Sequence, residues 1–321
     1  MSEGIDLTVC IVNWNARDLL RNLLRSLEVA GDELALEIIV VDNASSDRSL
    51  DIVECEFSHV TVIRNEHNLG FAKANNQAAR RARGRLLLFL NNDTVVGPGT
   101  LARMVAFFDE HPELVALGPK LVGADGRPQH TGGNLPTLTA LLDRIRFLRW
   151  TGIFHSAYHT YLRGGFDPNR SGPVERLTGA ALMVRRDQFT NCGGWDESFP
   201  FGFEDVDLSV RLRQSGGLYY LAEAEIVHLR HVSVRVNPRF AYLGAEFGYA
   251  RYLSKHHPSA WGRKLYKFLV IVDMPIRILS LAAQCASNLL LRRRERAWYR
   301  YQQLATACGF LVKDMRRFWH C

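Results

Sequence analysis

The sequence predicts an α/β fold in which a mostly parallel, twisted sheet carries helices on both faces and basic amphipathic helices follow. Three observations support it. In the first 120 residues, continuous apolar segments alternate with segments of helical periodicity, as in a parallel sheet covered on both faces. The chain has 321 residues, 47% of them hydrophobic, which is enough for a large core. From residue 241 onward the pattern is helical and basic.

We expect two domains, residues 1–239 and residues 240–321, because the charge is unevenly placed. Residues 240–321 contain 14 Lys and Arg against 4 Asp and Glu, a net charge of +10, while the whole chain carries +7. Residues 1–239 therefore carry −3. A basic region of this kind meets either nucleic acid or anionic lipid.

The elements of the first 110 residues follow one another regularly. Each expected strand is a short β-rich apolar run, and each expected helix has apolar residues three or four apart. Ser45 or Ser46 caps the second helix, and Pro98 opens the fourth. The strands are expected at residues 7–12, 37–41, 60–64 and 85–90, and the helices at residues 17–29, 46–56, 71–83 and 98–110.

The second half of this domain is less regular. Residues 121–175 are rich in Gly, Pro and Arg and have weak periodicity, so we expect a long excursion over the surface. The alternation then resumes and leads to His228. We expect a strand at residues 180–184, a helix at 185–191, an aromatic Gly-rich loop at 193–202, a helix at 204–214 and a strand at 218–221.

Polar residues follow three of the expected strands at their carboxyl ends. Asn13 follows the first strand and Asp42 the second, and Asn91, Asn92 and Asp93 follow the fourth. In open α/β sheets, ligands bind beyond the carboxyl ends of the strands. The sequence therefore predicts a ligand site at this edge of the sheet.

Asp93 and Asp42 are the acidic residues at this edge. Asp93 can hold a divalent cation bound to a diphosphate, because Mg²⁺ usually takes only one or two protein carboxylates. The alternative is a turn at residues 91–94 that caps the next helix. Asp42 can accept from the imide N–H of uracil or thymine, or from a ribose hydroxyl, and its alternative role is an Asx turn or helix cap.

Asn68 and Gly70 precede the helix expected at residues 71–83, and Asn75 lies inside it. Gly70 lets the backbone approach a ligand closely, and the free N–H groups of a helix N-terminus attract phosphate. Asn75 is a poor helix former one turn into the helix. This favours a functional role over that of an ordinary capped helix.

Glu204, Asp205 and Asp207 lie close together after an aromatic loop that contains Trp195. Acidic residues stabilise a helix N-terminus, and for each residue alone this is the simpler role. The large apolar side chains of the loop can also form a wall for a sugar. A carboxylate beside that wall can remove the proton from an acceptor hydroxyl.

His228 ends an expected strand, and His231 follows three residues later. A lone histidine is more often structural than a metal ligand. As a partner of Asp93 on one metal, His228 would supply a nitrogen donor, which favours Mn²⁺ more than Mg²⁺.

Together these motifs resemble the family 2 glycosyltransferases, in particular the bacterial rhamnosyltransferase-like branch. They cover most of residues 7–235 in the expected order. The resemblance implies a GT-A nucleotide-sugar domain and an inverting reaction. The motifs are VCIVNWN (9–15), VVDNASSD (40–47), NLGFAKANN (68–76), LLLFLNNDT (86–94), LTGAALMVRR (177–186) and GGWDESFPFGFEDVDLSVRLRQSG (193–216).

The resemblance also implies roles for single residues. Asp205 corresponds to the catalytic base, and Asp93 and His228 correspond to a site for Mg²⁺ or Mn²⁺. The residues expected near the nucleotide are Asn13, Asp42, Asn68, Gly70, Asn75 and Asn92. The residues expected near the acceptor are Trp195, Asp196 and Glu204.

The sequence departs from the family pattern in two places. The DxD-like motif reads Asn91-Asn92-Asp93, so only one carboxylate is present and weak metal affinity is expected. Where the family often has His-x-x-Gly-x-Ser, this chain has an additional imidazole at His231. Which of the two histidines binds the metal therefore stays open.

The expected activity is metal-dependent transfer of L-rhamnose from dTDP-rhamnose to a hydroxyl of a cell-surface glycan or polyprenyl-linked acceptor. UDP-linked galactose or N-acetylglucosamine is the alternative donor, because uracil and thymine share the edge that Asp42 would read. Asp205 would remove the acceptor proton. The acceptor oxygen would then attack the anomeric carbon opposite the leaving diphosphate.

Residues 268–291 form an apolar segment of 24 residues, long enough to span a bilayer. Asp273 and Arg277 argue against spanning, because their cost of roughly +5 to +7 kcal/mol cancels a gain of roughly −4 to −7 kcal/mol from the apolar residues. They are four residues apart and can pair on one helix face. A helix in the plane of an anionic membrane surface fits better than a spanning helix.

The N-terminal residues are acidic where a signal peptide is basic, and the six cysteines form no CxxC pair. We therefore expect a cytoplasmic protein, peripheral on the inner face of the cell membrane. A nucleic-acid binder that uses the basic tail is a remote alternative, since no such module is visible. A Rossmann dehydrogenase is set aside because no GxGxxG follows the first strand. The sequence is compatible with an oligomer and leaves the oligomeric state open.

Overall fold

The structure is a computed structural model that describes residues 4–31, 34–199, 202–229 and 238–321. The described residues form two compact units. The first contains the residues up to 135, 165–198 and 204–230, and the second contains 136–164, 199–203 and the residues from 231 onward. The units thus differ from a single division at residue 239, because residues 136–164 group with the C-terminal helices.

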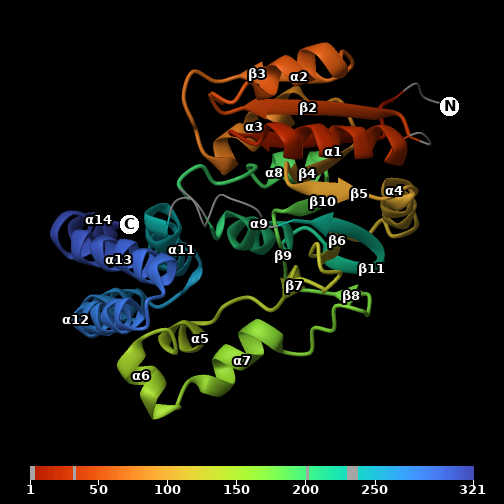
Figure 1. The fold of residues 1–321 in the computed structure, drawn as a ribbon. Helices are drawn as coiled ribbons and strands as arrows, with labels where there is room; N and C mark the ends of the chain where they lie inside the picture. The colour runs from red at the N-terminus through yellow and green to blue at the C-terminus, as the bar shows by residue number, and fades with distance from the viewer. Residues whose placement is uncertain (1–3, 32–33, 200–201, 230–237) are drawn as a thin grey trace. The chain divides into compact units, whose positions relative to one another are not determined.

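The first unit contains a mixed, mostly parallel sheet, nine-stranded in the part of the chain that the structure describes (Figure 1). Its order is β3-β2-β1-β4-β10-β6-β11-β5, with β8 beside β11. Strand β10 is antiparallel to both β4 and β6 and so joins two parallel groups. The strands are β1 Leu7–Asn13, β2 Leu36–Asp42, β3 Thr61–Arg64, β4 Leu86–Asn91, β5 Thr94–Val96, β6 Leu114–Val122, β8 Gly172–Pro173, β10 Ala181–Arg185 and β11 Gly217–His228, with a separate pair of β7 Gly132–Gly133 and β9 Arg176–Leu177.

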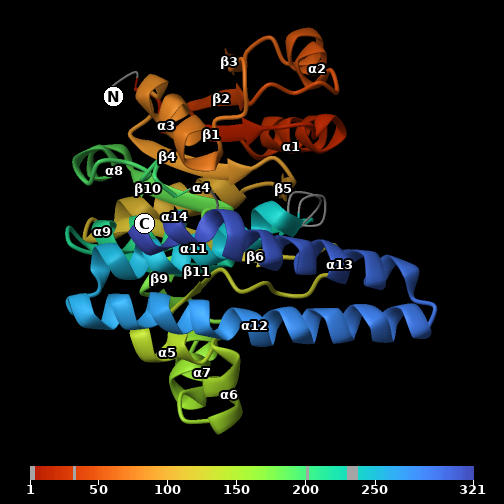
Figure 2. The same cartoon turned by 90° about the vertical axis from the view of Figure 1, so that its left-hand side faces the viewer.

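Helices cover both faces of this sheet, as the continuous apolar runs predict. Val9 and Ile11 of β1 pack into one core cluster with α1, α2 and α4, whereas Cys10 packs into the opposite cluster with α3, α8 and α9. Figure 2 shows α1 and α2 on one side of the strands and α3 and α8 on the other. The helices are α1 Arg17–Ala30, α2 Ser49–Glu56, α3 Phe71–Arg81, α4 Thr100–Glu110, α8 Arg186–Asn191 and α9 Glu204–Leu212.

The structure confirms the expected fold class, and strands β1 to β4 end within one residue of their expected limits. Three sheet strands were not expected, among them β8, which has only two residues. Strand β5 is three residues long, too short for a recognisable pattern, and the apolar run of β6 is interrupted by Gly118 and Pro119. Strand β11 continues past the expected residues 218–221 to His228.

The second unit begins inside the segment that was expected to be an irregular excursion. Residues 136–164 contain three helices instead, which corrects that expectation. Thr137 caps the first of them, because its hydroxyl oxygen accepts a hydrogen bond of 3.1 Å from the backbone N–H of Ala140. These helices are α5 Leu138–Leu142, α6 Arg146–Thr151 and α7 His155–Arg163.

The rest of the second unit is helical, as expected. Helix α12 has 31 residues, and it runs beside α13, to which a short turn connects it (Figure 2). Among the described residues it is the one helix long and apolar enough to cross a membrane. The predicted pairing of Asp273 with Arg277 is confirmed by an Oδ2–Nε distance of 2.7 Å. The elements are α11 Pro238–His256, α12 Ala260–Leu290, α13 Arg294–Gly309, the π-helix η1 Phe310–Asp314 and α14 Met315–His320.

Candidate active site

Three side chains expected near the nucleotide meet at the carboxyl ends of β1, β2 and β4. Asn13 and Asp42 are register partners in adjacent parallel strands, and Asn13 Nδ2 donates to Asp42 Oδ1 at 3.2 Å. Asn92 Nδ2 donates to Asn13 Oδ1 at 3.0 Å. Asp42 also accepts from the backbone N–H of Ser45 at 2.9 Å. The hydrogen bond from Ser45 is of the kind expected for the alternative role of Asp42, that of a turn-forming residue.

The loop before α3 lies next to this edge of the sheet. Asn68 Oδ1 accepts from the Gly70 N–H at 2.9 Å, and Asn43 Nδ2 at the end of β2 donates to the Gly70 carbonyl at 3.4 Å. Gly70 has a φ of +83°, a conformation that favours glycine. Asn75 is buried, and its Nδ2 donates to the Phe71 carbonyl within the helix at 3.1 Å. Its expected place beside a nucleotide stays a prediction.

Asp93 and His228 are 135 residues apart in sequence but adjacent in the structure. Thr94 of β5 is the register partner of His228 at the end of β11, and this pairing brings the two side chains together. The distance from His228 Nε2 to Asp93 Oδ1 is 3.3 Å. Asn91 Nδ2 lies 3.5 Å from the same Nε2.

The donor set of Asp93 and His228 fits one divalent cation. Two ligands that are each about 2.1 Å from a metal lie about 3 Å apart at a right angle, close to the observed 3.3 Å. Within the described ranges no group of three or more His, Cys, Asp or Glu side chains could hold a metal ion. A divalent cation of this kind usually takes its further ligands from phosphate oxygens and water. His231 lies outside the described residues.

Asp205 lies in the first turn of α9, and two backbone N–H groups hold its carboxylate. Gly179 N donates to Oδ2 at 3.2 Å, and Val206 N donates to Oδ1 at 2.8 Å. The next residue after Gly179, Ala180, accepts from the Asn91 N–H at the end of β4 at 2.9 Å. A short chain of backbone contacts thus links Asp205 to the strand end that carries Asp93.

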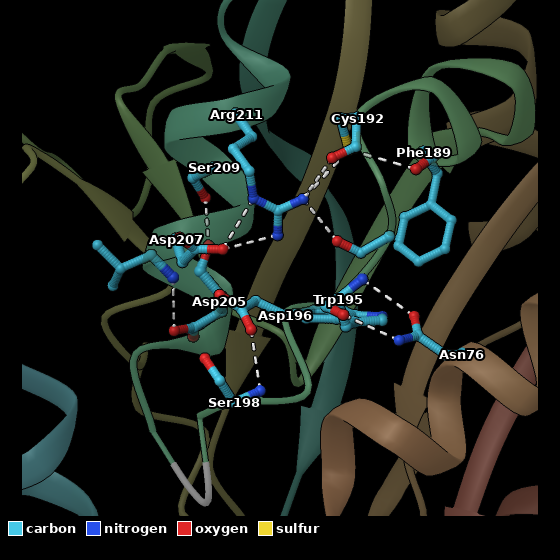
Figure 3. Close-up of polar contacts among 12 residues, drawn as sticks. Asn76, Phe189, Cys192, Trp195, Asp196, Ser198, Asp205, Asp207, Ser209 and Arg211 are labelled. Carbon is cyan, nitrogen blue, oxygen red and sulfur yellow. Dashed lines mark hydrogen bonds and ion pairs between the residues drawn. The ribbon is translucent and has the colours of Figure 1, made fainter. Parts of the chain in front are cut away.

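Arg211 anchors α9 to the loop before it, and the sequence analysis missed this role (Figure 3). Its Nη2 lies 2.7 Å from Asp207 Oδ2, and its Nη1 donates to the carbonyls of Cys192 and Gly194 at 2.7 and 2.6 Å. The four-residue spacing of Asp207 and Arg211 is the signal that could have indicated the ion pair. Burial raises the pKa of the Cys192 thiol, which keeps it protonated at neutral pH.

The residues expected near the acceptor have different environments. Trp195 is 1% exposed and packs in the core with its ring edge-on to Phe71 and Phe89. Apolar burial against the sheet holds this side chain inside, and its expected place near an acceptor stays a prediction. Asp196 is partly buried and accepts from the Ser198 N–H at 2.9 Å. Glu204 is buried at the start of α9.

Gln129 was not expected at the site from the sequence. Its side-chain amide contacts both the imidazole and the backbone carbonyl of His228. Gln129 follows β6 in the segment that was expected to be a surface excursion. Its sequence neighbourhood, rich in Gly, Asp and Arg, offers no signal for a contact with a residue so far along the chain.

The chain is similar to known glycosyltransferases in sequence. Residues 8–166 match the profile of the family described as Glycosyl transferase family 2. The chain is 27% identical over 271 residues to the N-acetylglucosaminyl-diphospho-decaprenol L-rhamnosyltransferase of Mycobacterium tuberculosis, covering 79% of this chain and 82% of that protein. It is 33% identical over 158 residues to the poly(ribitol-phosphate) beta-N-acetylglucosaminyltransferase TarS of Staphylococcus aureus, covering 47% of this chain and 27% of that protein.

Solved structures show the same fold. Residues 1–349 of S. aureus TarS superpose with a TM-score of 0.53 at 18% identity, covering 95% of this chain and 91% of that chain. The mannosyltransferase PcManGT of Pyrobaculum calidifontis, in complex with GDP-Man and Mn²⁺, superposes with a TM-score of 0.56 at 15% identity, covering 98% and 88%. Residues 8–166 therefore match glycosyl transferase family 2, and the protein is a glycosyltransferase with a GT-A fold.

Proposed function

We propose that this glycosyltransferase inverts the sugar configuration and uses Asp205 as its base. The observation that carries the proposal is the chain of backbone contacts from Asp205 through Gly179 and Ala180 to the end of β4, next to Asp93. Asp205 takes the proton of the acceptor hydroxyl, and the acceptor oxygen forms a bond to the anomeric carbon. The bond from that carbon to the diphosphate breaks, and its electron pair leaves with the diphosphate.

Asp93 and His228 would hold Mg²⁺ or Mn²⁺ at the diphosphate. A bound divalent cation would offset the negative charge that grows on the leaving diphosphate. The fit of an oxygen and a nitrogen donor 3.3 Å apart supports this assignment, and the nitrogen favours Mn²⁺. Asn92, which donates to Asn13, connects this position to the nucleoside end of the site.

The proposed donor is dTDP-rhamnose. The mycobacterial relative, which is an L-rhamnosyltransferase and aligns over 79% of this chain, supports rhamnose. UDP-N-acetylglucosamine or UDP-galactose is the second candidate, since a solved TarS structure is a complex with UDP-GlcNAc. Asp42 would accept from the imide N–H of either base, so it does not separate the two donors.

The proposed acceptor is a hydroxyl of a glycan carried on a polyprenyl diphosphate, and the protein would meet it at the inner face of the cell membrane. The name of the mycobacterial relative, which includes a diphospho-decaprenol, supports a lipid-linked acceptor. Helix α12 supports a peripheral position. Trp261, Phe268, Val272 and Leu279 form an exposed stripe along it, because their spacings of seven, four and seven residues keep them on one helix face.

Contacts inside the second unit argue against a membrane-spanning α12. Asp273 and Arg277 face inward, where Asp273 Oδ1 accepts from the Arg146 N–H at 3.0 Å and Arg277 Nη1 donates to Glu246 Oε1 at 2.6 Å. Insertion of α12 into lipid would break these contacts, at a large cost for charges left without partners. The proposal therefore places α12 on the membrane surface and not across it.

A thermal-shift panel tests the proposed donor and metal. dTDP-rhamnose, UDP-N-acetylglucosamine and UDP-galactose are each added to the full chain with and without Mn²⁺. We expect dTDP-rhamnose with Mn²⁺ to raise Tm by about 3–8 °C, as for a ligand well above its Kd. If Tm rises with a UDP-sugar and not with dTDP-rhamnose, the second candidate is the donor. If Tm rises equally with and without Mn²⁺, the metal site is contradicted.

A further inference from the structure

Gln129 makes two hydrogen bonds to His228, one at each end of its side-chain amide. Its Nε2 donates to the His228 carbonyl at 2.7 Å, and its Oε1 lies 2.9 Å from His228 Nδ1. The backbone holds Gln129 in place for these contacts. The Gln129 N–H donates to the carbonyl of Leu121 in β6 at 2.8 Å, and β6 is the parallel neighbour of β11, which ends at His228.

These two contacts define which imidazole nitrogen carries the proton. The backbone carbonyl of His228 can only accept, so the amide atom that faces it must be the NH₂ group. The other end of the amide, the oxygen Oε1, must then face Nδ1. An oxygen acceptor beside Nδ1 requires an N–H there, and in a neutral imidazole this leaves a lone pair on Nε2. The Asn91 amide Nδ2 approaches this nitrogen at 3.5 Å.

The lone pair of Nε2 lies beside the carboxylate of Asp93. Nε2 lies 3.3 Å from Asp93 Oδ1, so a nitrogen lone pair and a carboxylate face each other. Two electron-rich atoms at this distance are stabilised when a cation lies between them. The orientation of the ring therefore matches a metal ligand that donates through Nε2.

We infer that Gln129 is a positioning residue that fixes the ring orientation and the Nε2-donating tautomer of His228 for a divalent cation. The inference rests on the proposed metal role of Asp93 and His228. Outer partners of this kind commonly change metal affinity by about 10–100-fold when they are removed. In this role Gln129 acts through its two hydrogen bonds to His228.

The first experiment measures Mn²⁺ affinity of the full chain from the electron paramagnetic resonance signal of free Mn²⁺, alone and with dTDP present. Gln129→Met keeps the side-chain length and removes both hydrogen bonds. We expect it to weaken Mn²⁺ binding by about 10–100-fold. The matched control is Gln188→Met, at a partly buried glutamine in α8 whose side-chain amide donates to its neighbour Asp187, and it should bind Mn²⁺ like the parent.

The second experiment measures the tautomer of His228 directly, in the parent and in Gln129→Met. Nitrogen-15 chemical shifts of His228 at a pH where the ring is neutral should show the proton on Nδ1 in the parent, and a mixture of tautomers in Gln129→Met. A parent with the proton on Nε2 would overturn the inference, whatever the variant does. A folded Gln129→Met protein that binds Mn²⁺ within twofold of the parent would also overturn it.

His228→Ala separates this inference from the proposed function. If His228→Ala loses Mn²⁺ affinity while Gln129→Met does not, the metal site stands and the positioning role of Gln129 fails. If His228→Ala binds Mn²⁺ like the parent, the metal assignment of the proposed function fails, and the inference fails with it.

Discussion

The carboxylate of Asp205 is oriented by the backbone around it. It lies in the first turn of α9, and the N–H groups of Gly179 and Val206 each bond one of its oxygens. Both donors belong to the backbone, so the orientation depends on the loop before β10 and on the start of α9 more than on any single side chain. The carboxylate therefore keeps its position when neighbouring side chains change.

Replacement of Asp205 by Asn tests the base. Asn has nearly the same shape but cannot take a proton from the acceptor, so we expect turnover to fall by about 10²–10⁴-fold. Donor binding should survive, as measured by the Tm shift with donor and Mn²⁺. Asp187→Asn, at an exposed position in α8, is the matched control and should leave turnover unchanged. Normal turnover of Asp205→Asn would exclude Asp205 as the base.

The pKa of Glu37 makes the stability of the fold depend on pH. Burial acts to raise its pKa, but hydrogen bonds from the Arg83 N–H, the Thr8 hydroxyl and the Arg83 guanidinium lower the pKa below its usual value. Since the folded pKa is below the unfolded one, the carboxylate stabilises the fold above the unfolded pKa of about 4.3. This contribution is lost as the pH falls through the folded pKa.

Glu37→Gln should therefore lower Tm at pH 7, and its difference from the parent should shrink between roughly pH 5 and pH 3. Thermal unfolding followed by circular dichroism across this range checks the prediction. The control Glu110→Gln changes an exposed residue at the end of α4 and should track the parent. A constant difference between Glu37→Gln and the parent at all pH values would refute the assigned role.

At the element scale, local pattern was sufficient where each element buries a continuous apolar run. Strands β1, β2 and β4 could be read in this way, because both faces of each are covered, and the edge strand β3 was read although it is only partly buried. The pattern failed at β6, where Gly118 and Pro119 interrupt the run, and at α5 to α7, where no helical period was recognised. Strand β6 is stabilised by its neighbours β10 and β11, and these lie far along the chain.

Helix α12 carries a buried ionic network that its sequence only partly revealed. The spacing of Asp273 and Arg277 predicted their pair, but not the contact of Arg277 with Glu246 in α11. Burial acts to raise the pKa of Glu246, and Arg277 and Arg144 outweigh it and lower that pKa. Glu246 therefore stays ionised inside the second unit and depends on its cationic partners.

Arg277→Met should destabilise the protein by about 3–5 kcal/mol, because it leaves Glu246 and Asp273 buried with fewer partners. Urea unfolding measures the change. Arg296→Met, at an exposed position in α13, is the control and should change the free energy of unfolding by no more than about 0.5 kcal/mol. The double variant Glu246→Gln/Arg277→Met should recover part of the loss. If Arg277→Met left the free energy of unfolding unchanged, the ionic network would not be needed for stability.

At the scale of the whole molecule, the proposed peripheral position on a membrane makes the connection of α12 to α13 the expected contact. Leu289, Leu290 and Leu291 are 59%, 85% and 58% exposed at this turn. Three exposed arginines, at positions 292–294, follow directly. Apolar side chains beside a cluster of arginines match a lipid surface that carries negative headgroups.

The triple variant Leu289→Ser/Leu290→Ser/Leu291→Ser should weaken binding of the full chain to vesicles that contain phosphatidylglycerol by at least about tenfold. Burial of one leucine contributes about 1.5–3 kcal/mol, and about 1.4 kcal/mol corresponds to tenfold. Vesicle co-sedimentation measures the affinity. Val312→Ser changes an exposed residue in η1, away from this turn, and should bind like the parent. Equal binding of the triple variant would remove the turn as a contact.

By itself, the amino-acid sequence determined the fold class, the strand ends that carry Asn13, Asp42 and Asp93, and the glycosyltransferase family. These features depend on residues near one another in the chain, through periodicity, turns and motif order. Only the tertiary structure decided that Trp195 lies in the core and that Gln129 meets His228. Those outcomes depend on which distant strands become neighbours, and neighbouring strands are selected by the packing of the whole sheet rather than by local pattern.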